Sequence, residues 1–188
     1  MKIFILDNYD SFTYNLVHII EQIADEVVVK RNDEVTISEI ENFDKIVFSP
    51  GPGIPSDTKA MFTIIETFKG KKSILGVCLG HQAIAEYFSG KLINMPEVNH
   101  GREFKTQIIN KDYIFKNIPE KFNSGRYHSW IVDKANLPKE LEITSIDSET
   151  GMIMSLRHKK YDIRGVQFHP ESVMTKYGFR ILENWIMK

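Results

Sequence analysis

The single cysteine of the sequence, Cys78, stands in Gly76-Val77-Cys78-Leu79-Gly80, where an apolar run at residues 73–77 gives way to a helix-like stretch. Glycines two residues to either side are what a sharp strand-to-helix turn needs, because neighbouring backbones pass close to the raised side chain. The N–H groups and the positive dipole end of the following helix favour a thiolate over a thiol. This segment predicts a nucleophilic cysteine. A free cysteine that only fills a buried strand is the alternative.

A second polar group stands where another apolar strand stops, in Gly165-Val166-Gln167-Phe168-His169-Pro170-Glu171. In extended chain, residues two apart share a side, so the Glu171 carboxylate can bind one ring nitrogen of His169 and leave the other facing a thiol. Taken alone, this pattern is better explained by a strand-end histidine that is satisfied by a neighbouring acid. Combined with the cysteine turn, it supplies a nucleophile, a base and the group that orients the base. Zinc ligation is disfavoured, because one thiol and scattered histidines lack the spacing of a structural site.

A loop rich in glycine and proline, residues 49–55, follows the apolar run at residues 45–48. Glycine lets backbone approach a ligand, and proline holds the shape of the loop. Pro52 has no N–H, so an oxyanion donor from this loop has to come from Gly51, Gly53 or a neighbour. The lysine and hydroxyl of a phosphate-binding P-loop are absent, which disfavours a nucleotide site. An ordinary tight turn remains an alternative.

Strands and helices must place these segments together. Strand-like runs at residues 2–6, 26–30, 45–48 and 73–77 alternate with helix-like stretches, including 57–68, 81–88 and a short helix that we expect to begin at a Ser38–Glu41 capping box. Such alternation predicts an open, mostly parallel sheet with helices on both faces, which binds ligands beyond the carboxyl ends of its strands. Short apolar runs at 106–109, 141–146, 152–156 and 163–168 predict added antiparallel strands in the second half. A last helix, about 177–187, is expected to pack Phe179, Leu182, Trp185 and Ile186 on one face.

Composition limits the functional classes. The 188 residues, 42% of them hydrophobic, suit one domain over residues 1–188, able to bury roughly 70% of its unfolded surface. A net charge of −1 disfavours nucleic acid and membrane surfaces as partners. The amino terminus is too weakly apolar for a secretory signal or a bilayer span, so we expect a cytoplasmic protein. A single cysteine rules out an intramolecular disulfide.

Taken together, these segments resemble the class I (triad-type) glutamine amidotransferases, and within them the small subunits of anthranilate synthase and aminodeoxychorismate synthase. The resemblance runs nearly end to end, in the family's order, over Asp7-Asn8-Tyr9-Asp10-Ser11-Phe12-Thr13-Tyr14-Asn15, residues 49–53, residues 76–82, Tyr127-His128-Ser129 and residues 168–172. Two positions depart from the pattern: Trp130 stands where leucine is usual, and His100-Gly101-Arg102 where His-Gly-Lys is frequent. The second departure bears on the choice of partner more than on the chemistry.

The resemblance implies that Cys78, His169 and Glu171 form a catalytic triad and that Leu79 with Gly51, Pro52 and Gly53 forms the oxyanion hole. It also implies that Gln82, Ser129 and the backbone of Trp130 hold L-glutamine, that His128 is structural, and that no cofactor is needed in this chain. Ammonia released from glutamine would pass to a chorismate-binding synthase large subunit, for anthranilate formation, 4-amino-4-deoxychorismate formation, or both. We expect weak glutaminase activity in isolation and activation on assembly.

Other interpretations remain open at the level of sequence. Carbamoyl-phosphate and GMP synthetases use similar modules, but the length of this chain argues against both. A non-catalytic regulatory subunit would keep the fold and bind glutamine without turnover. A cysteine peptidase or γ-glutamyl hydrolase is a third class, which the glutamine-holding residues do not support.

Overall fold

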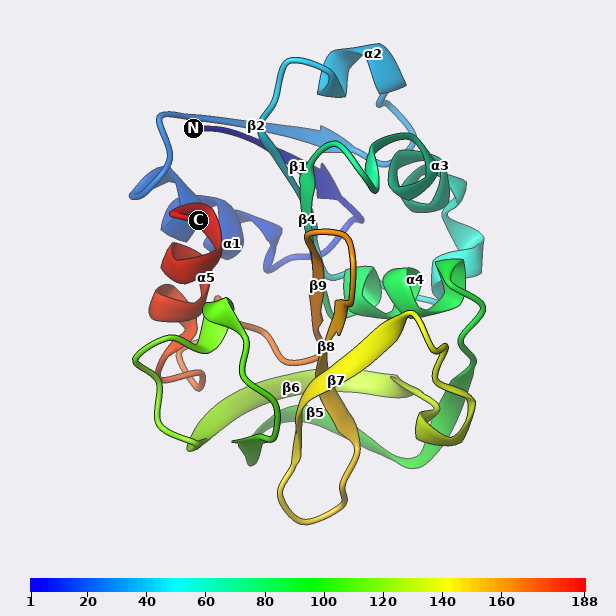
Figure 1. The fold of residues 1–188 in the computed structure, drawn as a ribbon, viewed down its shortest axis with the longest axis vertical. Helices are drawn as coiled ribbons and strands as arrows, with labels where there is room; N and C mark the ends of the chain where they lie inside the picture. Colours follow the sequence, from blue (N-terminus) through cyan, green and yellow to red (C-terminus); the bar gives the residue numbers. More distant parts are fainter.

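The computed structural model describes residues 1–95 and 101–188 in full, and residues 96–100 only as part of a strand. Within the described chain, nine strands form one sheet in the order β2-β1-β3-β4-β9-β8-β7-β5-β6 (Figure 1). Its first half is parallel and consists of β2 (Glu26–Arg31), β1 (Lys2–Asp7), β3 (Lys45–Phe48), β4 (Ser73–Val77) and β9 (Ile163–Val166). Its second half pairs antiparallel through β8 (Ile153–His158), β7 (Leu141–Asp147), β5 (Leu92–Ile108) and β6 (Lys121–Val132). The predicted fold class is confirmed.

Helices cover both faces of the parallel half, as Figure 1 shows. Helices α1 (Thr13–Glu21) and α5 (Gly178–Ile186) pack on one face, against Ile3 and Ile5 of β1. Helices α2 (Ile37–Ile40), α3 (Lys59–Phe68) and α4 (Leu79–Tyr87) pack on the other, against Phe4 and Leu6. Successive side chains of a strand point to opposite faces, so an unbroken apolar strand is what two covered faces require. Three single-turn helices complete the chain: η1 (Pro55–Asp57), η2 (Tyr113–Phe115) and η3 (Lys134–Asn136).

Two local expectations were wrong in detail. The capping box of α2 is formed by Thr36 and Glu39, two residues earlier than expected: the Thr36 N–H and hydroxyl both donate to Glu39 Oε2, at 2.8 and 2.9 Å. Thr36 is extended, whereas Ser38 already lies within the helix. In α5, Phe179 is 44% exposed, and Ile181 takes the expected place beside Leu182, Trp185 and Ile186 in the core.

The antiparallel half differs most from the expectation. The predicted run at 106–109 is the end of a much longer β5, and the partner of β5, strand β6, was not predicted. Strand β6 reads KFNSGRYHSWIV, with few β-branched residues and no strict alternation of apolar and polar side chains. The strand forms because β5 offers it a ladder of hydrogen bonds, a long-range cause that a local pattern does not carry.

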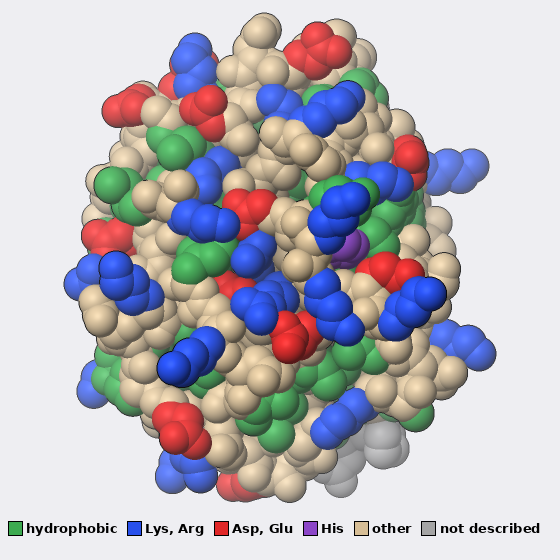
Figure 2. All heavy atoms as spheres, viewed as in Figure 1, with side chains coloured by type: hydrophobic (Ala, Val, Ile, Leu, Met, Phe, Trp, Pro, Cys, Tyr) green, Lys and Arg blue, Asp and Glu red, His purple; other side chains and the backbone are tan. Residues whose placement is uncertain are grey.

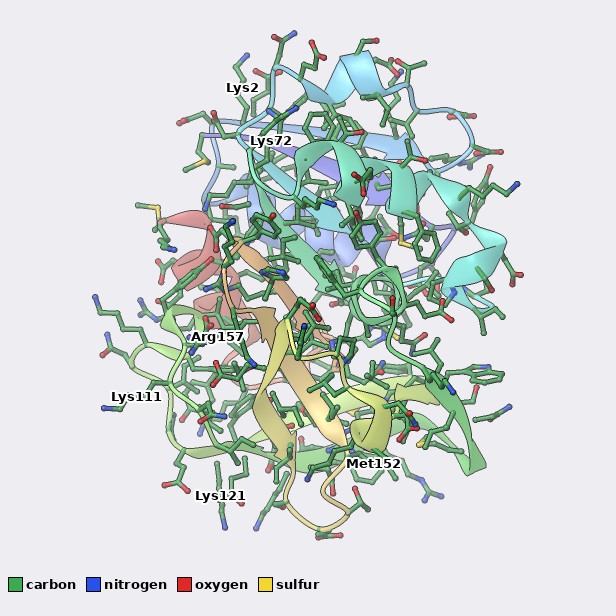
Figure 3. The ribbon with its side chains drawn as sticks, turned by 45° about the vertical axis from the view of Figure 1, so that its right-hand side comes forward. Lys2, Lys72, Lys111, Lys121, Met152 and Arg157 are labelled. Carbon is green, nitrogen blue, oxygen red and sulfur yellow. The ribbon has the colours of Figure 1, made fainter. Side chains whose placement is uncertain are left out.

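Charged groups crowd the face seen in Figure 2, where Lys and Arg side chains lie with Asp and Glu among them. Several cations of β8 and β9 are paired. Arg157, which Figure 3 labels on β8, binds Glu142 and donates to the carbonyl of Lys111 at 3.0 Å. Arg164 on β9 bonds Asp112 and Asp162. These ion pairs tie β7, β8, β9 and the loop after β5 together.

Candidate active site

Cys78 occupies the turn between β4 and α4. Its backbone has φ 51° and ψ −98°, which places a non-glycine residue in the left-handed half of conformational space. Such a backbone costs about 1–3 kcal/mol and persists only where its surroundings enforce it. One contact that holds this backbone conformation is the hydrogen bond from the Cys78 N–H to the Val166 carbonyl at the end of β9, at 2.8 Å. The predicted strand–turn–helix arrangement is present, with Cys78 at the amino-terminal end of α4.

The two glycines around Cys78 are required by close backbone contacts. A Cβ on Gly76 would lie 2.3 Å from the carbonyl carbon of Gly80, and a Cβ on Gly80 would lie 2.6 Å from the Cβ of Phe48 on β3. Neither distance is possible for real atoms, so any side chain at these positions would displace the start of α4. The glycine spacing therefore sets how closely the cysteine turn packs against β3.

His169 and Glu171 form a buried pair just beyond β9. The ring nitrogen Nδ1 of His169 donates to Glu171 Oε1 at 2.6 Å, and the two side chains are 2% and 0% exposed. This bond fixes the tautomer of the ring and leaves Nε2 directed elsewhere. Nε2 is buried and lacks a well-aligned hydrogen-bond partner within residues 1–95 and 101–188. The His169 N–H donates to the carbonyl of Gly125 on β6 at 3.1 Å, which ties the pair to the antiparallel half of the sheet.

Aromatic rings enclose the imidazole of His169. Tyr127 of β6 meets it edge to face with centroids 4.8 Å apart, and Phe12, just before α1, does so at 6.1 Å. The rings of Phe12 and Tyr127 contact each other at 5.1 Å, and the Tyr127 hydroxyl lies 3.1 Å from Ser172 Oγ. Two segments that are distant in sequence therefore enclose one ring. The roles of Phe12 and Tyr127 at His169 were not predicted, because no spacing in the sequence signals them.

The charge state of His169 follows from its neighbours. Burial lowers its pKa, but the nearby Cys78 sulfur and the Glu171 carboxylate outweigh that effect, and the pKa lies well above the ordinary 6.5. Both neighbours act by favouring the imidazolium. Cys78 is thus close enough to His169 to influence its protonation, although their contact is not an aligned hydrogen bond. A raised pKa favours the imidazolium, which is the form that can give a proton to a leaving group.

A cavity of about 170 Å³ opens at the Cys78 sulfur. Its lining contains seven of the ten predicted site residues, Gly51, Pro52, Gly53, Cys78, Gln82, Ser129 and Trp130, together with Tyr127 and His128. Cys78 is buried, with 6% of its surface exposed, but it lines this cavity and is therefore not sealed in the interior. His169, Glu171 and Leu79 are not among the lining residues. Leu79 is 2% exposed, and its side chain packs beneath Gly51, where an added Cβ would meet Leu79 Cδ2 at 2.7 Å.

The glycine loop is anchored to the loop after β1. The Asn8 N–H donates to Ser49 Oγ at 2.9 Å, and the Asn8 amide donates to the Ser49 carbonyl at 3.0 Å. A Cβ on Gly51 would lie 2.6 Å from Asn8 Cβ, so the loop lies flat against Asn8. Gly53 has φ +75°, which glycine adopts without strain. These contacts hold the backbone of residues 51–53 at the cavity wall.

Two further histidines near the site are neutral. Burial lowers the pKa of His81 to about 4; for His128, burial followed by the charges of Arg126 and His169 lowers the pKa to about 3. His128 Nδ1 is 3.1 Å from the Trp130 carbonyl, to which it must donate, because a carbonyl only accepts. The expectation that His128 is structural agrees with this contact, although its ring also lines the cavity. In the segment His100-Gly101-Arg102, which differs from the family's usual pattern, His100 lies outside the fully described residues and Arg102 is exposed.

Cavity volume alone would favour another place on the molecule, but the predicted residues do not lie there. A larger hollow of about 710 Å³ lies between the end of β5 and η2, lined by residues such as Ile109, Lys111 and Phe115, and holds none of the predicted site residues. Among the fully described residues, no cluster of three or more histidine, cysteine or acidic side chains is arranged to hold a metal ion. In the same residues, no helix is long and apolar enough to cross a membrane.

Comparison with known proteins agrees with this geometry. The family model Glutamine amidotransferase class-I matches residues 4–188. The anthranilate synthase component 2 of Lactococcus lactis subsp. lactis (strain IL1403) is 44% identical over 184 residues, covering 98% of this chain and 93% of that protein. The aminodeoxychorismate/anthranilate synthase component 2 of Bacillus subtilis (strain 168) is 45% identical over 188 residues, covering 98% and 95%.

Solved structures agree as well. A putative GMP synthase subunit from Thermoplasma acidophilum superposes with a TM-score of 0.89 at 25% identity, over 100% of this chain and 92% of that one. A glutamine amidotransferase from Thermotoga maritima, 16% identical, shares the fold with a TM-score of 0.76 over 100% and 81% of the two chains. The family match over almost the whole sequence and the two close relatives lead to one conclusion: this chain belongs to the class-I glutamine amidotransferase family.

Proposed function

We propose that this chain hydrolyses L-glutamine with Cys78 as nucleophile and His169 as acid and base. Glu171 orients the His169 ring and favours its protonated form. The observation that carries the proposal is the buried 2.6 Å His169–Glu171 pair next to a strained cysteine that opens on a cavity. No single segment provides this combination, because the nucleophile follows β4 and the pair follows β9.

The chemistry proceeds in two stages. The Cys78 thiolate attacks the side-chain amide carbon of glutamine, and a carbon–sulfur bond forms while the carbonyl oxygen becomes an oxyanion. The His169 imidazolium then gives its proton to the amide nitrogen, and the carbon–nitrogen bond breaks. Ammonia departs, and Cys78 remains acylated as a γ-glutamyl thioester. Neutral His169 next takes a proton from water, whose oxygen attacks the thioester carbon. Glutamate departs, and the thiolate–imidazolium pair is restored.

Backbone donors near Cys78 are proposed to stabilise the oxyanion. The Leu79 N–H is the first of α4 and lies beside the nucleophile, and the Asn8-anchored glycine loop forms the facing wall of the cavity. Pro52 lacks an N–H, so the second donor is assigned to Gly51 or Gly53. Such preorganised donors typically contribute 10²–10³ in turnover each.

Gln82, Ser129 and the backbone of Trp130 are proposed to hold the amino-acid end of glutamine. All three residues line the cavity, which supports the assignment. The Trp130 carbonyl already accepts from Gln82 Nε2 at 2.9 Å, so we assign this carbonyl the task of orienting Gln82. The Gln82 oxygen is then left as the atom that can accept from the substrate.

The decisive experiment replaces Cys78 with alanine in the assembled enzyme. We expect glutamine-dependent product formation to fall by at least about 10³-fold, as loss of a covalent nucleophile does in comparable triads. Product formation from added ammonia is the control, because it needs assembly and the partner but no glutamine hydrolysis. Glutamine-dependent turnover near the wild-type rate in Cys78→Ala would exclude the proposed mechanism.

We propose further that the ammonia goes to a chorismate-using synthase subunit, giving anthranilate, 4-amino-4-deoxychorismate, or both. The relatives that support this are called component 2 of anthranilate or aminodeoxychorismate synthase. Exposed apolar side chains beside the site offer a contact surface for that subunit: Tyr9 is 48% exposed, Tyr14 60% and Val173 100%. Phe12, which lies between Tyr9 and Tyr14 in the chain, contacts His169.

The partner is identified by purifying the chain from its native cell and sequencing the large subunit bound to it. The expected results are a chorismate-using partner, together with faster glutamine hydrolysis in the complex than in the isolated chain. Equal rates with and without the partner would contradict the proposed activation. Val173→Asp is expected to weaken the complex while leaving the fold intact, because a fully exposed valine makes no core contacts.

A GMP-synthetase role is the second candidate. The Thermoplasma acidophilum protein, named as a subunit, is covered over 92% by this chain, so length does not separate the two candidates. Sequence identity does favour the chorismate enzymes, at 44–45% against 25%. A purely regulatory subunit is disfavoured by the paired His169 and Glu171. That the chain needs no cofactor, acts in the cytoplasm and binds neither nucleic acid nor membrane stays a prediction.

A further inference from the structure

Gln167 is a buried amide beside the nucleophile whose role the proposed mechanism leaves open. Its side chain is fully buried, and its Nε2 lies 3.6 Å from Cys78 Sγ. Its Oε1 accepts from Gln82 Nε2 at 3.2 Å. The Gln167 N–H donates to the Met154 carbonyl of β8 at 2.8 Å, so the main chain is anchored independently of the side chain.

The side-chain amides of Gln82 and Gln167 have only one orientation that satisfies all of their hydrogen bonds. The Trp130 carbonyl can only accept, so the Gln82 atom that meets it must be the NH₂ group. The same NH₂ meets Gln167, which must therefore present its oxygen there. The remaining end of the Gln167 amide, its NH₂, then faces the Cys78 sulfur. The orientation of both amides is thus fixed by a backbone carbonyl of β6.

We propose that Gln167 is a positioning residue that donates an N–H to the Cys78 sulfur, with the direction of its amide set by Gln82 and the Trp130 carbonyl. A thiolate accepts a hydrogen bond more strongly than a thiol does, so a fixed donor favours the reactive form. The same chain links the nucleophile to Gln82 at the substrate end of the cavity. This inference rests on the proposed role of Cys78 as nucleophile.

The test measures the rate at which iodoacetamide alkylates the chain as a function of pH. Cys78 is the sole cysteine, so every thiol adduct reports on it. The variants are Gln167→Met, which keeps the length of the side chain but removes the donor, and Gln167→Glu, which replaces the donor with an acceptor. Ser155→Ala is the matched control, because Ser155 is buried on β8 opposite Val166 and its hydroxyl bonds Thr144 and Ser145 instead of the sulfur.

We expect the pH of half-maximal alkylation to rise by about one unit in Gln167→Met, a tenfold loss of thiolate that corresponds to about 1.4 kcal/mol. The rise should be larger in Gln167→Glu and absent in Ser155→Ala. A packing role alone would lower the urea midpoint of unfolding without moving the alkylation profile. A wild-type profile in Gln167→Met would overturn the inference.

Glutamine hydrolysis by the alkylated protein separates the role of Cys78 as nucleophile from the role of Gln167 as its hydrogen-bond donor. If alkylation of the wild-type chain leaves glutamine hydrolysis intact, Cys78 is not the nucleophile, and the role given to Gln167 falls with it. If alkylation abolishes hydrolysis but the profile of Gln167→Met is unshifted, only the role of Gln167 falls. Should Gln167→Glu not fold, Gln167→Met decides the matter, because it introduces no charge.

Discussion

Replacing Glu171 with glutamine removes one charge and keeps the shape of the side chain. The carboxylate accepts a 2.6 Å bond from His169 and is fully buried, so water cannot substitute for it. Hydrogen bonds to charged groups contribute about 1.5–3 kcal/mol, which corresponds to a roughly 10–150-fold loss of kcat. KM for glutamine should change little, because Glu171 is not among the residues that line the cavity.

Glutamate release by the assembled enzyme at saturating glutamine measures this effect. Glu183→Gln is the control, since Glu183 bonds only Arg180 on the outer face of α5 among the described residues. Titration of the His169 ring by NMR should show a lower pKa in Glu171→Gln, because one of the two groups that favour the imidazolium is lost. A kcat within twofold of the wild type would refute the argument that the buried charge supports catalysis.

Two further predictions concern the surroundings of the site. Gly80→Ala should destabilise the fold by about 1–3 kcal/mol and abolish turnover, because the added Cβ would meet Phe48 at 2.6 Å. The control Gly70→Ala should do neither, because its Cβ would lie 3.5 Å from Tyr161. Equal urea midpoints for the two variants would contradict the prediction. The pKa of His81 is depressed from 6.5 to about 4, so the stability that its neutral form contributes above pH 6.5 is lost as the pH falls toward 4. Between pH 7 and 5 the wild type should lose about 2 kcal/mol more than His81→Met in urea unfolding; equal losses would show that His81 does not resist protonation.

The parallel half of the fold could be predicted from the sequence because its causes are local. Strand β1 is apolar at four successive positions, from Ile3 to Leu6, as a strand with both faces covered must be. The turn at Cys78 and the His169–Glu171 pair were predictable for the same reason: each is encoded within a few residues. That they meet follows from the rule that parallel strands end at one edge of the sheet.

The remaining features depend on contacts between distant segments. Strand β6 exists because β5 pairs with it, and through β6 the carbonyls of Gly125 and Trp130 reach His169 and Gln82. Phe12 reaches the imidazole from the other end of the chain. The one local signal for Gln167 was a polar amide at the end of an apolar strand, two residues before the predicted base, and that pattern does not reveal what the amide contacts.

The covalent intermediate tests the central claim most directly. The assembled enzyme is quenched in acid during glutamine turnover, digested, and mapped by mass spectrometry. The predicted result is a γ-glutamyl adduct on the peptide that carries Cys78, which is absent from Cys78→Ala and forms at least as fast as turnover. Full glutamine turnover with no adduct at Cys78, or with the adduct on another residue, would contradict the account.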